Sequence, residues 1–351
     1  MYWHYSIVQY KTKPMSFQIE IDKSIKVPIY QQITDFIIKC IESGTVQVGD
    51  VLPSINQVAR ENNVARETVI KSFSALQERG IVQAVQGKGF FVMTKSVDTR
   101  NRVFLLFDTF SAYKQTFYKA LRDSLGPNSI VDLYFHHFNP KIFKKLLRDA
   151  VGNYTYYVVL PFDYPEIADY LKYVPEERLC LTDRYPGYLK IGYSAVYQKF
   201  DDDVYQALAI AGQLIRKYNC LTLVFCDTIT EVPAELKEGF ERYCQENGVN
   251  YQISCGIASD EIISKGDSFL IIDDDDLVRL VEIANERKLI IGQDIGIISY
   301  NDTPLKKVVG SGISVISTDF KKMGETIAGM ILNNEKVCVQ NPCQFIDRGS
   351  F

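Results

Sequence analysis

The sequence predicts a small α+β domain near the N-terminus, followed by a larger α/β domain with parallel sheets. In residues 27–79, apolar side chains recur at helical spacing. Residues 81–93 contain two short apolar runs around a Gly-Lys-Gly turn, and residues 102–351 alternate apolar strands with helices. The chain has 351 residues and a hydrophobic share of 46%, which is enough for two or three domains with sizeable cores.

The first two helices are predicted from their ends. Val27-Pro28 opens a helix because proline is tolerated in the first turn, and Gly44 stops it. Leu52-Pro53-Ser54 precedes a second helix, with Ser54 as its N-cap. Asn62-Asn63 is expected to form the next turn because asparagine tolerates left-handed backbone.

A third helix is expected over residues 66–79, where Gly80 follows. Its expected buried stripe is Val69, Phe73 and Leu76. Its expected outward side chains are Arg66, Thr68, Lys71 and Ser72. Two strands, 81–85 and 90–93, then flank the turn 86–89. Two helices joined by a short turn and followed by a hairpin make a winged helix-turn-helix, whose second helix would enter the major groove of DNA.

The chemistry of this domain suits double-stranded DNA. Arginine can bond guanine O6 and N7 at once, and short hydroxyl side chains can reach phosphates. The first 97 residues hold 11 Lys/Arg and 8 Asp/Glu, or +3, whereas the remainder holds 28 and 35, or −7. For any single residue, a solvated surface charge or an ordinary tight hairpin explains the pattern as well. The ordered set favours a DNA-binding domain.

This segment resembles the GntR-type winged-helix domain over about 65 residues. The matching motifs are LPS (52–54), VARETV (64–69), LQERG (76–80) and QGKGFFV (86–92). The sequence departs from the family at Asn56, where arginine is usual, and at Ala65, where serine is usual. The resemblance and the chemistry together predict these DNA-binding residues: Ser54, Asn56, Arg66, Thr68, Lys71, Gly87, Lys88 and Gly89.

We divide the chain into four parts. Residues 1–24 are an N-terminal extension that contains Trp3 and a second candidate start, Met15. Residues 25–93 form the DNA-binding domain, and the polar segment 94–101 is the linker. Residues 102–351 form a two-lobed domain for effector binding and dimerisation.

The second domain is expected to alternate strands and helices. The expected strands are 103–108, 130–135, 156–160, 178–181, 221–225, 251–255, 268–272, 295–299 and 314–317. The expected helices are one around Phe117, Leu121 and Leu125, then 140–150, 164–171, 203–217, 234–247, 259–265, 277–288 and 320–332. Apolar strands with helices between them predict two parallel-sheet lobes joined by a hinge. The second lobe is expected to begin with the helix 203–217 and to end with the helix 320–332. Ligands of such sheets bind at the carboxyl ends of the strands.

Polar groups gather at those strand ends. Carboxylates, an arginine and an amide can pair with sugar hydroxyls, and the 22 tyrosines and 20 phenylalanines can pack on sugar C–H faces. The predicted effector-binding residues are Asp108, Ser111, Tyr113, Phe117, Asp183, Arg184, Asp273, Asn301 and Phe320. Two alternatives stay open: the acids at 273–276 suit a solvated helix N-terminus, and Asp183 with Arg184 suits a surface ion pair.

The second domain resembles the periplasmic-binding-protein-like effector domain of LacI-type repressors. The match is clearest over residues 294–332, with support from Gly239-Phe240 and from FIDRGS at 345–350. The resemblance implies that Asp183, Arg184, Asp273 and Phe320 face the ligand and that Asn301 replaces the first acid of an aspartate pair. Leu236 stands where an arginine is frequent. A GntR-type domain on such a body resembles the arabinose-repressor-like subset, which are cytoplasmic dimers released from DNA by a sugar.

Other site classes lack their motifs. The eight cysteines form no CxxC pair and the three histidines do not accompany them, so no metal site is expected. Scattered cysteines suggest reduced thiols in a cytoplasm. No run of 18 apolar residues exists to span a membrane. GxGxxG after the first strand, GxxxxGK[ST] and GxSxG are all missing, and no lysine context matches the pyridoxal-phosphate bodies that some GntR heads carry, so no catalytic residue or cofactor is expected.

The sequence therefore predicts a homodimeric DNA-binding regulator. The expected role is a repressor of carbohydrate-use genes, released from its operator by a monosaccharide or a derivative. A regulator that needs its ligand in order to bind DNA is the alternative, and an enzyme on the α/β body is the third possibility. The residues separate neither inducer from corepressor nor repressor from activator, and they name neither the sugar nor the operator.

Overall fold

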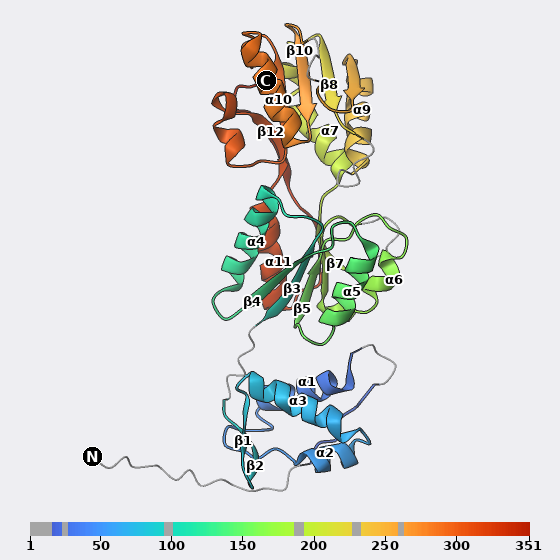
Figure 1. Cartoon of the computed structure of the whole chain (residues 1–351), viewed down its shortest axis with the longest axis vertical. Helices are drawn as coiled ribbons and strands as arrows, with labels where there is room; N and C mark the ends of the chain where they lie inside the picture. The colour runs from blue at the N-terminus through green and yellow to red at the C-terminus, as the bar shows by residue number, and fades with distance from the viewer. Residues whose placement is uncertain (1–15, 23–26, 95–100, 186–192, 227–232, 259–262) are drawn as a thin grey trace, which may run out of the picture.

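The chain folds into an N-terminal domain and two α/β lobes, which lie one above another in Figure 1. This computed structural model describes residues 16–22, 27–94, 101–185, 193–226, 233–258 and 263–351. The expected extension 1–24 and linker 94–101 therefore lie largely outside the described residues. We call the lobe that follows the N-terminal domain lobe 1 and the distal one lobe 2.

The N-terminal domain is the expected winged helix-turn-helix. Its elements are α1 (Ile29–Glu42), α2 (Ile55–Glu61), α3 (Arg66–Glu78), β1 (Val82–Val85) and β2 (Gly89–Val92). The apolar stripes of α1 and α3 face each other in one core, and β1 pairs with β2 in an antiparallel hairpin. Ser54 caps α2 as predicted, since its hydroxyl accepts a hydrogen bond from the Gln57 N–H at 3.2 Å.

Two features of this domain differ from expectation. Ser72 was expected on the outer side of α3, but it is fully buried and shares a 2.9 Å hydrogen bond with the Thr34 hydroxyl of α1. Residues 16–22, assigned to the extension, pack against the domain. Phe17 and Ile19 join its core, and Asn62 bonds the backbone of both residues. The apolar–polar alternation of residues 17–21 was the signal for this extended segment.

Lobe 1 is a parallel sheet with the strand order β13-β7-β6-β5-β3-β4. The strands are β3 (Arg102–Phe107), β4 (Ile130–Phe135), β5 (Tyr156–Val159), β6 (Leu179–Asp183), β7 (Ser194–Tyr197) and β13 (Cys338–Gln340). Its helices are α4 (Ala112–Leu125), α5 (Pro140–Ala150), α6 (Ile167–Leu171) and α11 (Phe320–Asn333). Helices α4 and α11 cover one face, and α5 and α6 cover the other.

Lobe 2 has the strand order β14-β12-β11-β10-β8-β9, and only β14 runs antiparallel to its neighbour in this sheet of described residues. The strands are β8 (Cys220–Val224), β9 (Tyr251–Ser254), β10 (Asp267–Ile271), β11 (Gly296–Tyr300), β12 (Ser314–Thr318) and β14 (Cys343–Ile346). The helices are α7 (Phe200–Ile210), α8 (Gly212–Ile215), α9 (Glu235–Asn247) and α10 (Asp274–Glu286). Helices α7 and α9 cover one face and α10 covers the other.

The expected alternation of strands and helices is confirmed in both lobes, with four differences. Strands β7, β13 and β14 were not expected. The helix expected over 203–217 is divided at Ala211 into α7 and α8. In the helix expected over 259–265, residues 259–262 lie outside the described part and 263–265 are not helical. Finally, α11 packs on α4 in lobe 1, although the sequence rhythm placed it at the end of the second lobe.

The chain passes between the lobes at three described places: after β7, after β12 and after β13. Asn341, which is 2% exposed, joins these crossings. Its N–H donates to the Tyr197 carbonyl at 2.7 Å, and its amide Nδ2 donates to Thr318 Oγ1 at 2.8 Å and to the Asp319 carbonyl at 2.9 Å. A buried amide with these partners holds the crossings in register.

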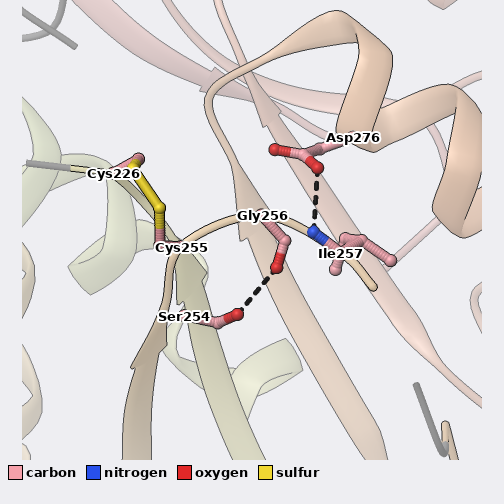
Figure 2. The surroundings of a disulfide bond; sticks show 6 residues. All are labelled: Cys226, Ser254, Cys255, Gly256, Ile257 and Asp276. Carbon is pink, nitrogen blue, oxygen red and sulfur yellow. Dashed lines mark hydrogen bonds between the residues drawn. A yellow bond between two sulfur atoms is a disulfide. The ribbon is translucent and has the colours of Figure 1, made fainter. Parts of the chain in front are cut away.

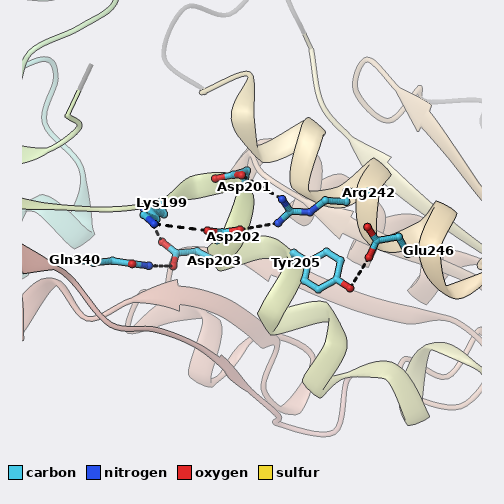
Figure 3. Close-up of polar contacts among 8 residues, drawn as sticks. All are labelled: Lys199, Asp201, Asp202, Asp203, Tyr205, Arg242, Glu246 and Gln340. Carbon is cyan, nitrogen blue, oxygen red and sulfur yellow. Dashed lines mark hydrogen bonds and ion pairs between the residues drawn. The ribbon is translucent and has the colours of Figure 1, made fainter. Parts of the chain in front are cut away.

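Asp203 lies beside the same crossings, in the first turn of α7 (Figure 3). Its carboxylate accepts hydrogen bonds from the Lys199 N–H at 3.1 Å and from Gln340 Nε2 at 3.2 Å. The neighbouring Asp202 instead turns toward α9, where it pairs with Arg242 at 2.7 Å. Burial raises the pKa of Asp203 to about 6 from its ordinary 3.8, although both hydrogen bonds favour the charged form.

This raised pKa predicts a pH-dependent stability. Because the folded chain binds the Asp203 proton more tightly than the unfolded chain, protonation stabilises it. This contribution is complete below about pH 4 and is lost as pH rises to about 6. Asp203→Asn, which cannot ionise, should raise the free energy of unfolding at pH 8 by about 1–3 kcal/mol and flatten its slope between pH 4 and 6. Urea unfolding at several pH values measures this; equal slopes in both proteins would contradict it.

Candidate functional site

The first candidate site lies on the N-terminal domain, where α2 and α3 meet. Arg66 is the first residue of α3 and is exposed. Its Nε donates a 3.0 Å hydrogen bond to the Oδ1 of Asn56 on α2. Asn56, the position at which the sequence departs from the family pattern, thus orients the arginine while its guanidinium stays in solvent. An oriented, exposed guanidinium is suited to bidentate base contact.

The wing presents backbone at its tip. Gly87, Lys88 and Gly89 are exposed, and both glycines have left-handed backbone, with φ of 74° and 108°. A Cβ on Gly89 would also lie 3.3 Å from Val51 Cγ1. The turn therefore requires glycine at this position for two reasons, conformation and space. The predicted wing geometry is present.

Lys71 and Thr68 lie elsewhere on α3. The Lys71 Nζ stands 4.0 Å from the centre of the Tyr30 ring on α1, which is cation–π geometry. The structure therefore directs Lys71 toward α1 and does not group it with Arg66 and Asn56. Thr68 is half-buried one turn closer to Arg66. Contact of either residue with DNA remains a prediction.

The second candidate site is a cleft of about 240 Å³ between the lobes. Seven of the nine predicted effector-binding residues line it: Asp108, Tyr113, Asp183, Arg184, Asp273, Asn301 and Phe320. The other two do not. Ser111 caps α4 by accepting from the Lys114 N–H, and Phe117 is 1% exposed and packs on Phe107 in the core of lobe 1. The prediction that Phe117 binds the effector was therefore wrong, because its helical spacing with Leu121 and Leu125 places it in the core of lobe 1.

On the lobe 1 side, the cleft is built around a buried ion pair. The Lys114 Nζ bonds the Asp108 Oδ1, and both residues are nearly inaccessible. Burial alone would lower the pKa of Lys114, but Tyr113 and Asp108 outweigh burial and raise it. Asp183 has left-handed backbone, with φ of 68°, and accepts from Gln198 Nε2. Burial raises the pKa of Asp183 even though Lys114 opposes the shift.

On the lobe 2 side, Lys306 organises the loop after β11. It is 3% exposed, and its Nζ lies 2.8 Å from the Tyr300 carbonyl, 2.9 Å from the Asn301 carbonyl and 2.7 Å from Asp274 Oδ1. Burial lowers the pKa of Lys306 despite the nearby Asp274 carboxylate. Asn301 has left-handed backbone, with φ of 61°, and among the described residues its buried Oδ1 has no hydrogen-bond partner.

Aromatic rings complete the walls of the cleft. The rings of Tyr113 and Phe320 pack at a centroid distance of 4.7 Å, which joins α4 to α11. Phe200 and Phe225 face them from lobe 2. Apolar faces combined with a few buried polar groups are typical of small-molecule sites, because the faces supply burial and the polar groups supply orientation.

Two parts of the chain match known protein families. Residues 29–92 match the family "Bacterial regulatory proteins, gntR family", and residues 216–351 match the "Periplasmic binding protein-like domain" family. The chain carries a GntR-type helix-turn-helix domain and a periplasmic-binding-protein-like domain. The transcriptional repressor YtrA of Bacillus subtilis is 30% identical to this chain over 81 residues. That alignment covers 23% of this chain and 62% of YtrA, so it concerns the GntR-type domain.

Solved structures resemble the periplasmic-binding-protein-like domain. The trehalose repressor of Escherichia coli has a TM-score of 0.59 at 13% identity and covers 70% of this chain and 100% of its own. A dimeric Lac repressor with an 11-residue C-terminal deletion has a TM-score of 0.59 at 12% identity and covers 71% of this chain and 98% of its own. At these identities the likeness shows a common fold.

Several polar residues that line the cleft were not predicted from the sequence, namely Lys114, Gln198, Asp274, Asp276, Thr303 and Lys306. In the sequence, Lys114 and Lys306 do not differ from ordinary surface lysines, because neither is adjacent to its partner carboxylate. Lys306 could have been found from its position in the loop that follows β11, where Asn301 had already been singled out. Asp274 and Asp276 belong to the acidic run 273–276, for which a solvated helix N-terminus was the open alternative.

The expectation of reduced thiols was wrong for two cysteines. Cys226 follows β8, Cys255 follows β9, and they form a disulfide (Figure 2). The pair is 29 residues apart in sequence, and parallel pairing of β8 with β9 brings it together. Cys226 also lines the cleft. Just beyond the disulfide, Asp276 Oδ1 accepts a 2.8 Å hydrogen bond from the Ile257 N–H, so α10 is tied to the same strand ends.

No helix within the described ranges is both long and apolar enough to cross a bilayer.

The environment of Lys306 predicts a stability change. Lys306→Met should lower the free energy of unfolding by about 1–3 kcal/mol, because the Tyr300 and Asn301 carbonyls lose their buried donor. Lys307→Met, at the exposed next position, is the matched control and should change stability by less than about 0.5 kcal/mol. Urea unfolding at pH 7 measures both variants. Equal effects in the two would show that Lys306 does not hold this loop.

Proposed function

We propose that this protein is a DNA-binding transcription regulator, a repressor that a small sugar or sugar derivative releases from its operator. Double-stranded DNA and a monosaccharide-sized effector are its proposed partners, and the bacterial cytoplasm is its proposed location. The observation that carries the proposal is the combination of two sites in one chain. An exposed Arg66, oriented by Asn56, lies on a GntR-type domain, and a polar, aromatic-walled cleft lies between two lobes.

The names of the related proteins support this assignment. YtrA is a transcriptional repressor, and the repressor MngR of Escherichia coli, which serves a mannosyl-D-glycerate system, is 35% identical over 71 residues. The alignments cover 62% and 31% of those two proteins, so they support the DNA-binding part. The trehalose and Lac repressors support a sugar as the effector through the fold of the second domain.

In the proposed mechanism, ligand binding shifts the population toward lobes closed around the cleft. Lobe 1 can transmit this change, because Arg178 NH2 lies 2.7 Å from Asp35 Oδ2 on α1 and ties lobe 1 to the N-terminal domain. In a homodimer, a change in lobe geometry would alter the spacing of the two domains relative to the operator half-sites. The exposed Phe110, at 63%, and the open edge of β4 offer a surface for that dimer.

The DNA-binding half of the proposal is tested at Arg66. Arg66→Ala should weaken binding to the cognate promoter fragment by about 1–3 kcal/mol, because a bidentate base contact is lost. Arg66→Lys should lose nearly as much, since lysine keeps the charge without the fork. Lys39→Ala on α1 is the charge-matched control. Fluorescence anisotropy at fixed salt measures all three. Affinities equal to wild type for both Arg66 variants would remove Arg66 from the base-reading residues.

The effector half of the proposal is tested by a thermal-shift screen of the full chain against monosaccharides. A sugar that binds only the folded state at 100 times its Kd should stabilise it by about 2.7 kcal/mol and raise Tm. The hit is then titrated into a preformed DNA complex. Release of DNA supports induction, and tighter binding would instead establish a corepressor. A flat response to every sugar would contradict a sugar effector.

A further inference from the structure

We propose that the effector is a monosaccharide-sized polyol that carries a protonated amine, and that the cleft rejects phosphorylated and carboxylated sugars. This inference rests on the proposed effector function of the cleft and names the chemical class of its ligand. The cleft volume of about 240 Å³ limits the ligand to roughly one sugar ring. Three observations support a positively charged ligand. They are the surplus of carboxylates over cations in the lining, the position of this surplus on lobe 2, and a buried acceptor without a partner.

The charges that line the cleft do not balance. The lining carboxylates are Asp108, Asp183, Asp273, Asp274 and Asp276, and the lining cations are Lys114, Arg184 and Lys306. Lys114 is neutralised by Asp108, and Lys306 by Asp274 at 2.7 Å. Arg184 then stands against Asp183, Asp273 and Asp276. Burial raises the pKa of Asp183 and favours its neutral form, so Arg184 offsets one of the other two carboxylates and the described part of the lining keeps one uncompensated negative charge. Such a surplus favours a cation and repels an anion, more strongly in a partly desolvated site than in water.

The surplus lies on the lobe 2 side. Lobe 1 contributes two acids and two bases to the lining, whereas lobe 2 contributes three acids and only Lys306. Asp273 and Asp276 stand at the N-terminus of α10, where the helix dipole offsets part of their charge. Each also accepts a backbone N–H, from Asp275 and Ile257. Neither arrangement supplies a formal positive charge, so the negative surplus of the described lining remains.

Asn301 supplies the independent observation. Its Oδ1 is buried in the wall of this cleft and has no partner among the residues that the structure describes. Lys306 holds its carbonyl, so the loop is fixed in place without satisfying the side chain. An unsatisfied buried acceptor destabilises the folded protein, and a hydrogen-bond donor on the ligand would remove this cost.

The described lining therefore combines a surplus of carboxylates with a buried acceptor that has no partner. An ammonium group brings three N–H donors and a positive charge, whereas a hydroxyl brings one donor. A phosphate or carboxylate brings mainly acceptors and a negative charge, so it would leave Asn301 unpaired and face Asp273. Leu236, which is 1% exposed, provides only an apolar surface on that side. Among sugars of equal size, the aminated one satisfies this wall best.

The proposal is tested with matched ligands on the full-length chain. Isothermal titration compares D-glucose, D-glucosamine and D-glucose 6-phosphate, and the same three forms of galactose and mannose. In the series that binds, the amino sugar should bind at least about 10-fold more tightly than its parent, which corresponds to about 1.4 kcal/mol. The phosphate should bind most weakly. A phosphate that binds more tightly than its parent, or an amine without advantage, overturns the proposal.

Two variants locate the charge recognition. Asp273→Asn should cut amino-sugar affinity by about 10-fold and change parent-sugar affinity by less than about 3-fold. Asp275→Asn, in the same helical turn but outside the cleft lining, is the matched control and should alter neither. If Asp273→Asn weakens the binding of the amino sugar and of its parent sugar equally, the Asp273 carboxylate does not recognise the ammonium charge and the proposal fails. Parent sugars that bind alone would overturn this inference but keep the sugar effector, whereas no sugar binding would overturn both.

Discussion

The hydrogen bonds of Asn341 are the constraint on which the two-lobed domain depends. A chain that crosses three times between lobes could separate them by a loose hinge, but one buried amide here bonds the ends of β7 and β12 as well as Asp319. These bonds fix where the two sheets meet, and they therefore fix how far the lobe 1 wall of the cleft stands from the lobe 2 wall. The closure that we propose would therefore be a rotation about this point, because the three crossings are bonded to one another there.

The polar contacts that organise each wall of the cleft lie within a single lobe. The Asp108–Lys114 pair belongs wholly to lobe 1, and the bonds from Lys306 to Asp274, Tyr300 and Asn301 belong wholly to lobe 2. Neither set needs a partner across the cleft. In the proposed mechanism, a ligand that bridges the lobes would therefore spend little of its binding energy on ordering side chains, and this energy could shift the lobe equilibrium instead.

The sequence was most informative where burial follows a local period. The strands β3 to β5 and the helices of the winged domain were predicted within a few residues, since apolar spacing reports which face of an element is covered. It could not report which sheet an element joins, so α11 was assigned to the wrong lobe and the short strands β7, β13 and β14 were missed. Strand ends located five of the seven predicted residues that line the cleft, namely Asp108, Asp183, Arg184, Asp273 and Asn301, and the family resemblance supplied Phe320. Lys114 and Lys306 were not predicted as cleft residues, because the sequence does not distinguish a buried lysine from a surface lysine when its partner carboxylate is unknown. The disulfide between Cys226 and Cys255 was not predicted, because only the pairing of β8 with β9 brings the two residues together.

The position of α11 has a consequence for how the protein is made. Lobe 1 begins at β3, but its sheet and its α4 face are complete only when α11 and β13, up to Gln340, have been added. On the ribosome, the winged domain emerges whole about 250 residues before lobe 1 can close its core. Synthesis therefore produces a finished DNA-binding domain attached to an incomplete lobe 1, which can become a folded unit only after Gln340 has been translated.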